Sequence, residues 1–116
     1  MPRQKVLVAR FYATTSGSMP VREWLLSLNK QDKIEIGSDI ANLEFNWPAG
    51  PSQCKSLEDG IFEVRSRMTG GRTARVLFFI KEEQMVLLHG FIKKTRKTPR
   101  QELDLAKKRK KEMEEI

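Results

Sequence analysis

The sequence predicts an α+β fold, in which an antiparallel β-sheet carries two helices from the N-terminal half and one C-terminal helix. Between residues 54 and 92, four short apolar or alternating segments are joined by connectors too short for parallel crossovers. Apolar residues follow a helical spacing between residues 20 and 45, and a third helical pattern follows Pro99. The length of 116 residues favours one domain spanning residues 1–116.

The N-terminal half predicts one strand and two helices. Residues 5–12 are rich in β-branched and aromatic side chains and predict a strand. A helix should open at Pro20, which suits the first turn, with Ser18 as its cap. A second helix should run from about residue 29 to 45, because the two prolines and the glycine in 47–51 cannot continue it.

The C-terminal half predicts four strands and a helix. The strand segments are 54–57, 61–67, 73–80 and 85–92. Their short connectors predict consecutive hairpins and therefore an antiparallel meander, which the first strand joins. Pro99 should open the last helix, with Thr98 as its cap.

The chain is strongly basic, with 22 Lys and Arg against 15 Asp and Glu, a net charge of +7 and a pI near 9.8. Such a surplus favours a polyanionic partner, nucleic acid above all. Cys54 is the only cysteine, and no Cys/His pair has zinc-ligand spacing, so we expect no disulfide, metal or cofactor. No apolar stretch near the N-terminus is long enough for a signal peptide, so we expect a cytoplasmic protein without a membrane anchor.

Side-chain alternation places basic groups on one face of the sheet. Glu63, Arg65 and Arg67 share a face of their strand, and Arg75 lies on the next strand. Facing arginines repel unless an anion or a carboxylate such as Glu63 lies between them. The basic run in 91–100 could extend the patch. The alternative is an ordinary exposed face with a Glu63–Arg75 ion pair.

Several motifs resemble the RelE/ParE toxin superfamily. They are Lys55-x-Leu57, the segment Gly60–Arg65 and the segment Ala74–Phe79. The stretch Leu87–Lys94, with Thr98-Pro99 and Ala106-x-x-Arg109 after it, is similar to the HigB-like, phage-derived branch, and the resemblance extends over nearly the whole chain.

This resemblance implies a small RelE-like fold and the toxin of a type II toxin–antitoxin pair. Such a toxin is a metal-independent mRNA endoribonuclease, an mRNA interferase that acts on the ribosome, near 16S rRNA, and inhibits translation. A HigA-like helix-turn-helix antitoxin would bind it, and operator DNA would be contacted only through that antitoxin.

Metal-free RNA cleavage uses the 2′-hydroxyl as nucleophile, so the enzyme must orient it and neutralise the charge developing on the phosphate. Arg65 and Arg75 are the expected ligands of the scissile phosphate, because a guanidinium binds two phosphate oxygens at once. Lys93 and Lys94 could stabilise charge or protonate the leaving oxygen. The expected RNA contacts are Lys55, Arg67, Arg96 and Lys97. We expect these cations to converge on one solvent-facing hollow.

The proton-transfer group is less clearly indicated. Glu63, His89 and Asp104 are candidates, and so is Glu102. His89 is the only histidine, but alternation would place it on the same face as its apolar neighbours Leu87 and Phe91, which favours a structural role.

Two other functions fit the same features. One is a ParE-like inhibitor of DNA gyrase on the same fold, without nuclease activity. The other is a non-enzymatic nucleic-acid-binding module, which requires only the positive charge.

Overall fold

The computed structural model describes residues 4–93 and 98–115 of the chain. The elements are, in order, β1 (Val8–Phe11), α1 (Pro20–Ser27), α2 (Lys30–Asn46), β2 (Cys54–Ser56), β3 (Phe62–Arg67), a 3₁₀ turn (Thr69–Gly71), β4 (Thr73–Lys81), β5 (Gln84–Lys93) and α3 (Arg100–Glu114). The α+β class and all the predicted helices and strands are confirmed. None of the helices in these residues has the length and apolar character needed to cross a bilayer.

The five strands form one sheet in the order β1-β5-β4-β3-β2. The predicted antiparallel meander is confirmed for β2 to β5. β1 lies beside β5 and runs parallel to it, with Val8 opposite Gln84, so the sheet as a whole is mixed rather than antiparallel throughout. Two helices separate β1 from β2, so the short-connector argument that fixes the meander does not apply to the first strand.

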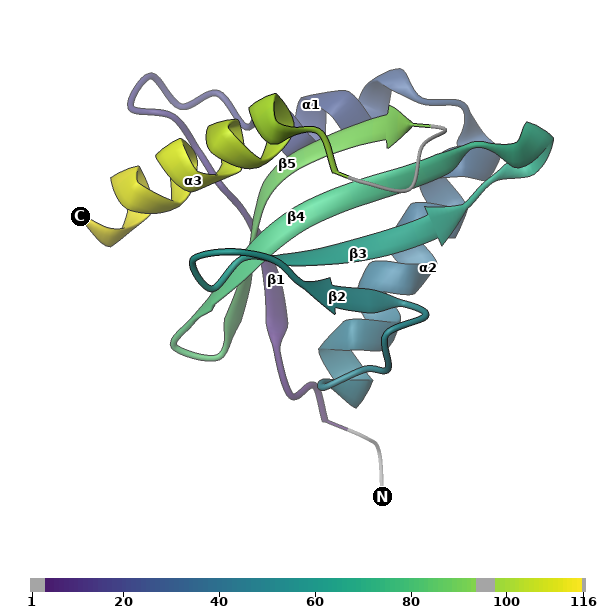
Figure 1. Ribbon diagram of the computed structural model, residues 1–116, viewed down its shortest axis with the longest axis horizontal. Coiled ribbons are helices and arrows are strands. Elements are labelled where there is room, and N and C mark those ends of the chain that lie inside the picture. Colours follow the sequence, from purple (N-terminus) through teal and green to yellow (C-terminus); the bar gives the residue numbers. More distant parts are fainter. Residues whose placement is uncertain (1–3, 94–97, 116) are drawn as a thin grey trace.

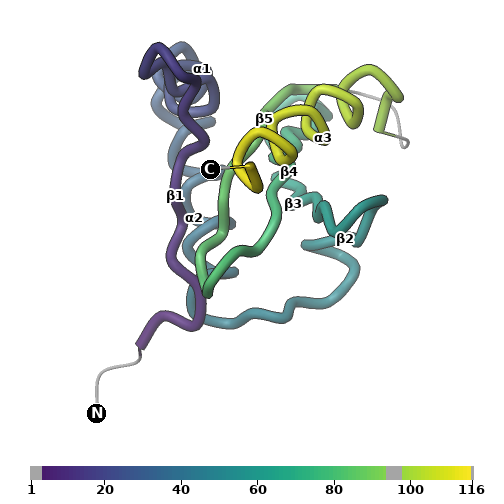
Figure 2. The backbone as a smooth tube through the Cα atoms, turned by 90° about the vertical axis from the view of Figure 1, so that its left-hand side faces the viewer, coloured from purple at the N-terminus to yellow at the C-terminus, as the bar shows by residue number. Residues whose placement is uncertain are grey.

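Helices cover both faces of the sheet, and each face has its own apolar core. α1 and α2 lie behind the sheet in Figure 1 and α3 lies in front of it, and the rotated view separates them to opposite sides (Figure 2). Successive residues of β4 alternate between the two cores, because Phe78 packs toward α1 and α2 whereas Leu77 and Phe79 pack toward α3. The face that carries α3 is the one on which the predicted basic residues lie.

A β-bulge interrupts the pairing of β4 with β5. Leu77 is opposite His89 and Phe78 is opposite Leu87, so Leu88 is an extra residue on β5. The bulge shifts the alternation after Leu88 by one position. His89 therefore faces α3 and not the side of Leu87, which corrects that part of the assignment made from alternation, whereas Phe91 does lie on the same face as His89.

The helix starts differ from the predicted caps in two places. Ser18 does not cap α1, because its hydroxyl donates to the Glu23 carboxylate at 2.6 Å. Thr98 does not cap α3 either, because its hydroxyl donates to Glu63, on β3. Thr98, which was predicted to cap α3, therefore connects the start of α3 to the sheet.

Candidate functional site

Basic side chains from four strands meet on the α3 face of the sheet. Arg65 on β3 is directly opposite Arg75 on β4, and Lys55 on β2 is directly opposite Glu63 on β3. Lys93, at the end of β5, is opposite Thr73, two residues along β4 from Arg75, and so lies on the same face. We call Lys55, Arg65, Arg75 and Lys93 the cation cluster. The structure therefore places these four of the predicted cations on one face of the sheet.

Glu63 lies at the centre of the cation cluster and is completely buried. Its Oε1 accepts from Arg75 Nη1 at 2.9 Å and forms an ion pair with Arg65 Nε at 3.4 Å. Its Oε2 accepts from the Thr98 hydroxyl. The predicted role of Glu63 as the carboxylate between the arginines is confirmed, and it also anchors the start of α3.

The cluster has an open part and a closed part. Lys55 is exposed, and the Arg65 side chain is 32% exposed and donates to the Pro51 carbonyl at 3.3 Å. Arg75 is only 5% exposed, and Lys93 is buried as well. Arg75 and Lys93 therefore do not face an open hollow, which corrects the expectation that all the cations do.

Lys93 is the most unusual cation of the cluster. Its Nζ is buried and has no hydrogen-bond partner among the residues that the structure describes. Burial lowers the pKa of this amine, and the positive charges of Arg75 and Lys55 lower it further, while Glu63 and Glu102 act in the opposite direction. A buried amine without an acceptor favours either a neutral state or an anion as partner.

His89 stands beside the cluster because of the bulge. Its Nε2 contacts the Glu102 carboxylate on α3, and its ring stacks on Phe91, with centroids 5.4 Å apart. Phe91 is in turn opposite Arg75 on β4. Two of the four candidates for proton transfer, His89 and Glu102, are therefore one hydrogen-bonded pair on the same face of the sheet as the cation cluster.

The remaining predicted residues lie outside the cation cluster. Arg67 is exposed at the end of β3, where it lines a hollow together with Arg65 and with two acidic residues of α2, Glu35 and Asp39. Asp104 forms an exposed ion pair with Arg100, one turn before it on α3, at 3.1 Å. Three predicted residues lie outside the described part of the chain, namely Lys94, Arg96 and Lys97. Among the described residues, no group of His, Cys, Asp and Glu is arranged to hold a metal ion.

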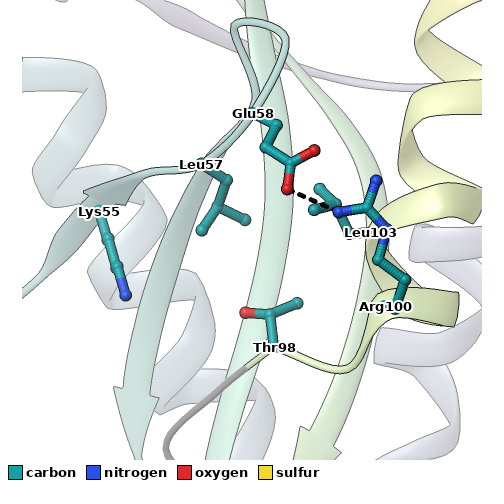
Figure 3. Close-up of a pocket in the computed structure, with 6 residues that line it drawn as sticks. All are labelled: Lys55, Leu57, Glu58, Thr98, Arg100 and Leu103. Atoms are coloured by element: carbon teal, nitrogen blue, oxygen red, sulfur yellow. Dashed lines mark hydrogen bonds and ion pairs between the residues drawn. The ribbon is translucent and has the colours of Figure 1, made fainter.

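A pocket of about 290 Å³ opens between β2, the β2–β3 turn and the start of α3. Its lining consists of Lys55, Leu57, Glu58, Thr98, Arg100 and Leu103. Lys55 and Arg100 stand on opposite sides of the pocket, with Leu57 and Thr98 between them (Figure 3). The pocket adjoins the cation cluster through Lys55, a member of it, and through Thr98, which is bonded to Glu63.

An ion-pair network at the rim of the pocket holds α3 against the β2–β3 turn. Glu58 accepts from Arg100 at 2.6 Å and from Lys107 at 2.5 Å. These two hydrogen bonds lower the pKa of Glu58 to about 2. Sequence reasoning missed these rim residues and Thr98, because Thr98-Pro99 signals a helix start and the acidic turn resembles any solvated connector.

The family model for the phage-derived protein Gp49-like (DUF891) matches residues 23–111 of the chain. The match begins within α1, ends in the last turns of α3 and includes every described residue of the cation cluster and of the adjoining pocket. No curated protein matches the chain at a significant level. Membership of this Gp49-like family implies an antitoxin as partner. The chain belongs to the Gp49-like family of phage-derived proteins, a family of toxin–antitoxin toxins.

Proposed function

We propose that the chain is a RelE/HigB-type toxin that cleaves mRNA on the ribosome without a metal ion. The observation that carries the proposal is the convergence of four cations from β2, β3, β4 and β5 around one carboxylate. Even without Lys93, whose pKa is lowered, the three remaining cations outnumber the Glu63 carboxylate between them, which leaves a local surplus suited to a phosphodiester.

The exposure of each cation supports a division of roles. Lys55 and Arg65 are accessible and would make the first contacts with the RNA backbone. Arg75 is bonded to Glu63 and would reach the scissile phosphate only after the contact between Thr98 and Glu63 opens. Until then, Arg75 acts as a positioning residue, since it holds Glu63 in place.

In the proposed reaction, the 2′-oxygen attacks the adjacent phosphorus and the bond to the 5′-oxygen breaks. The products are a 2′,3′-cyclic phosphate and a 5′-hydroxyl, so one proton leaves the 2′-hydroxyl and one reaches the 5′-oxygen. Lys93 has a lowered pKa, and His89 is bonded to Glu102, so these groups are the candidates for moving the two protons. Lys94 remains a further candidate.

The partners follow from this function. The proposed substrate is mRNA in the ribosome, which places the toxin in the cytoplasm. Arg67, Arg96 and Lys97 are proposed contacts with mRNA or 16S rRNA. A HigA-like helix-turn-helix antitoxin would neutralise the toxin, and operator DNA would be bound through the antitoxin.

Arg65→Ala and Lys55→Ala test the proposal directly, because both side chains are accessible and neither fills a core. If each contact acts in the transition state, each variant should cleave more slowly by about 10²–10³-fold. Arg22→Ala, on the exposed side of α1 behind the sheet, removes the same charge and should cleave normally.

Cleavage is read by mapping the 5′ ends of mRNA after expression in bacteria, and with purified ribosomes in the presence and absence of EDTA. Because EDTA also strips Mg²⁺ from ribosomes, the purified assay requires a parallel control that shows the ribosomes intact. Undiminished cleavage by both variants, or a strict need for divalent ions in the chemical step, would contradict the proposal.

The burial of Arg75 favours a second candidate, a toxin of this family without nuclease activity, such as a ParE-like gyrase inhibitor. In that case, Arg75 and Glu63 would only stabilise the sheet. Growth arrest without new mRNA ends, accompanied by trapped complexes of gyrase with cleaved DNA, would select this candidate. Salt-sensitive RNA binding without cleavage would select the binding module.

A further inference from the structure

The pocket beside the cation cluster combines an apolar floor with a charged rim. Leu57 and Leu103 supply the apolar surface, and Leu103 is 6% exposed. Lys55 and Arg100 supply positive charge on opposite sides of the rim (Figure 3). An apolar surface beside phosphate-binding cations matches a nucleotide, whose base has apolar faces and polar edges next to its phosphate.

We propose that this pocket is a nucleobase subsite that favours a base with an exocyclic amine over uracil. The inference rests on the proposed function, because it takes the neighbouring cation cluster as the phosphate site. The pocket volume, about 290 Å³, lies just below the range of about 300–1,000 Å³ in which small-molecule ligands bind. It therefore suits one ring system rather than an extended peptide.

Glu58 is the residue that would distinguish a base with an exocyclic amine from uracil. Its carboxylate lines the pocket and stays ionised in neutral solution, since Arg100 and Lys107 hold its pKa at about 2. An ionised carboxylate only accepts hydrogen bonds, and its two oxygens offer about four acceptor positions, of which these two cations use one each. The amine at C4 of cytosine donates to a carboxylate, whereas the C4 carbonyl of uracil repels it.

Two mononucleotides that differ at this one group test the proposal with the intact chain. Cytidine 3′-monophosphate and uridine 3′-monophosphate are titrated against the protein, with inorganic phosphate as a third probe. Binding is followed by NMR through the methyl resonances of Leu57 and Leu103. We expect the cytidine nucleotide to bind about tenfold more tightly than the uridine nucleotide, and both to bind more tightly than phosphate.

Three variants isolate the Glu58 carboxylate. Glu58→Gln introduces an amide that both donates and accepts, so the tenfold preference should disappear. Asp59→Asn removes one negative charge from the same turn without touching the pocket lining, and asparagine tolerates the positive φ of 55° at this position. Lys107→Gln breaks the Glu58–Lys107 ion pair by changing the lysine and leaves the Glu58 carboxylate in place. Both controls should keep the preference.

The outcomes separate this inference from the nuclease proposal. Equal binding of the two nucleotides, phosphate binding as tightly as either, or unmoved leucine resonances would each overturn the subsite. Loss of the preference in Asp59→Asn or Lys107→Gln would also overturn it, because the effect would not belong to the Glu58 carboxylate. Absence of RNA cleavage with the preference intact would overturn the nuclease alone.

Discussion

Replacing either member of the buried Glu63–Arg75 pair should destabilise the fold, and by unequal amounts. Glu63 is completely buried and Arg75 is 5% exposed, so neither charge recovers its hydration when its partner is removed. Arg75→Leu leaves the Glu63 carboxylate with Arg65 and the Thr98 hydroxyl. Glu63→Leu removes the carboxylate that Arg75 and Arg65 share, while the two guanidinium groups stay on directly opposite residues of β4 and β3.

Removing one partner of a buried ion pair costs about 3–5 kcal/mol. The loss of stability should lie near the lower end of this range for Arg75→Leu and near the upper end for Glu63→Leu. The double variant should lose about 2 kcal/mol or less, because an apolar pair of similar volume replaces a buried ion pair at little cost. The free energies of unfolding are measured by urea denaturation, followed by the fluorescence of Trp24 and Trp47. Glu63→Gln supplies a milder variant in case Glu63→Leu fails to fold.

The double-mutant cycle also bears on function. If both single variants lose less than about 1 kcal/mol and their effects add in the double variant, water must reach the pair in solution. The buried geometry would then be wrong, and Arg75 would be accessible to a phosphate in solution.

Three further predictions follow from packing and charge. Gly90→Ala should destabilise the fold by about 1–3 kcal/mol, because the new Cβ would stand 2.5 Å from Trp24 Cζ3. Gly37→Ala in α2 should stabilise the fold by about 0.5–1 kcal/mol, because nothing lies within 4 Å of its new Cβ. Thermal unfolding of the two variants measures both effects. Burial raises the pKa of the Cys54 thiol to about 11, so a thiol reagent at pH 8 should label the native protein far more slowly than the unfolded protein, and fast native labelling would contradict its burial. The folded pKa of Glu58 is about 2, below its unfolded value of about 4.3, so the stabilisation from its ion pairs is complete above pH 4.3 and is lost as the pH falls from there toward 2. The difference in unfolding midpoint between the wild type and Glu58→Gln should therefore vanish near pH 2. A difference that stays constant with pH would refute the lowered pKa of Glu58.

The fold was largely predictable because its signals are local. Short connectors force hairpins, and proline and glycine mark the helix ends, so every element occurs close to its predicted place. The partner of β1 could not be predicted, because it depends on a pairing between segments far apart in the chain. The bulge at Leu88 was also hidden, since Leu87-Leu88-His89 shows no glycine or other local signal at the inserted residue.

The residues of the candidate site could be predicted from the sequence, but the burial of their side chains could not. Period-two alternation correctly placed Glu63, Arg65 and Arg75 on one face. Alternation does not say what covers that face. One contact to that face comes from Thr98 at the start of α3, whose hydroxyl donates to Glu63 instead of to its own helix. Such a contact depends on how the helix docks, and composition and spacing carry no information about it.

The position of β1 has a consequence for biosynthesis. Of the strands in the sheet, this one is synthesised first, yet its partner β5 is synthesised last. Until that partner is available, Val8–Phe11 can contact α1 and α2, for example through the bond from the Ala9 amide to the Glu44 carboxylate at 2.8 Å. Pairing across so much of the chain slows folding. The nascent polypeptide therefore cannot complete its sheet, or assemble the cation cluster on it, before nearly all of its residues have been synthesised.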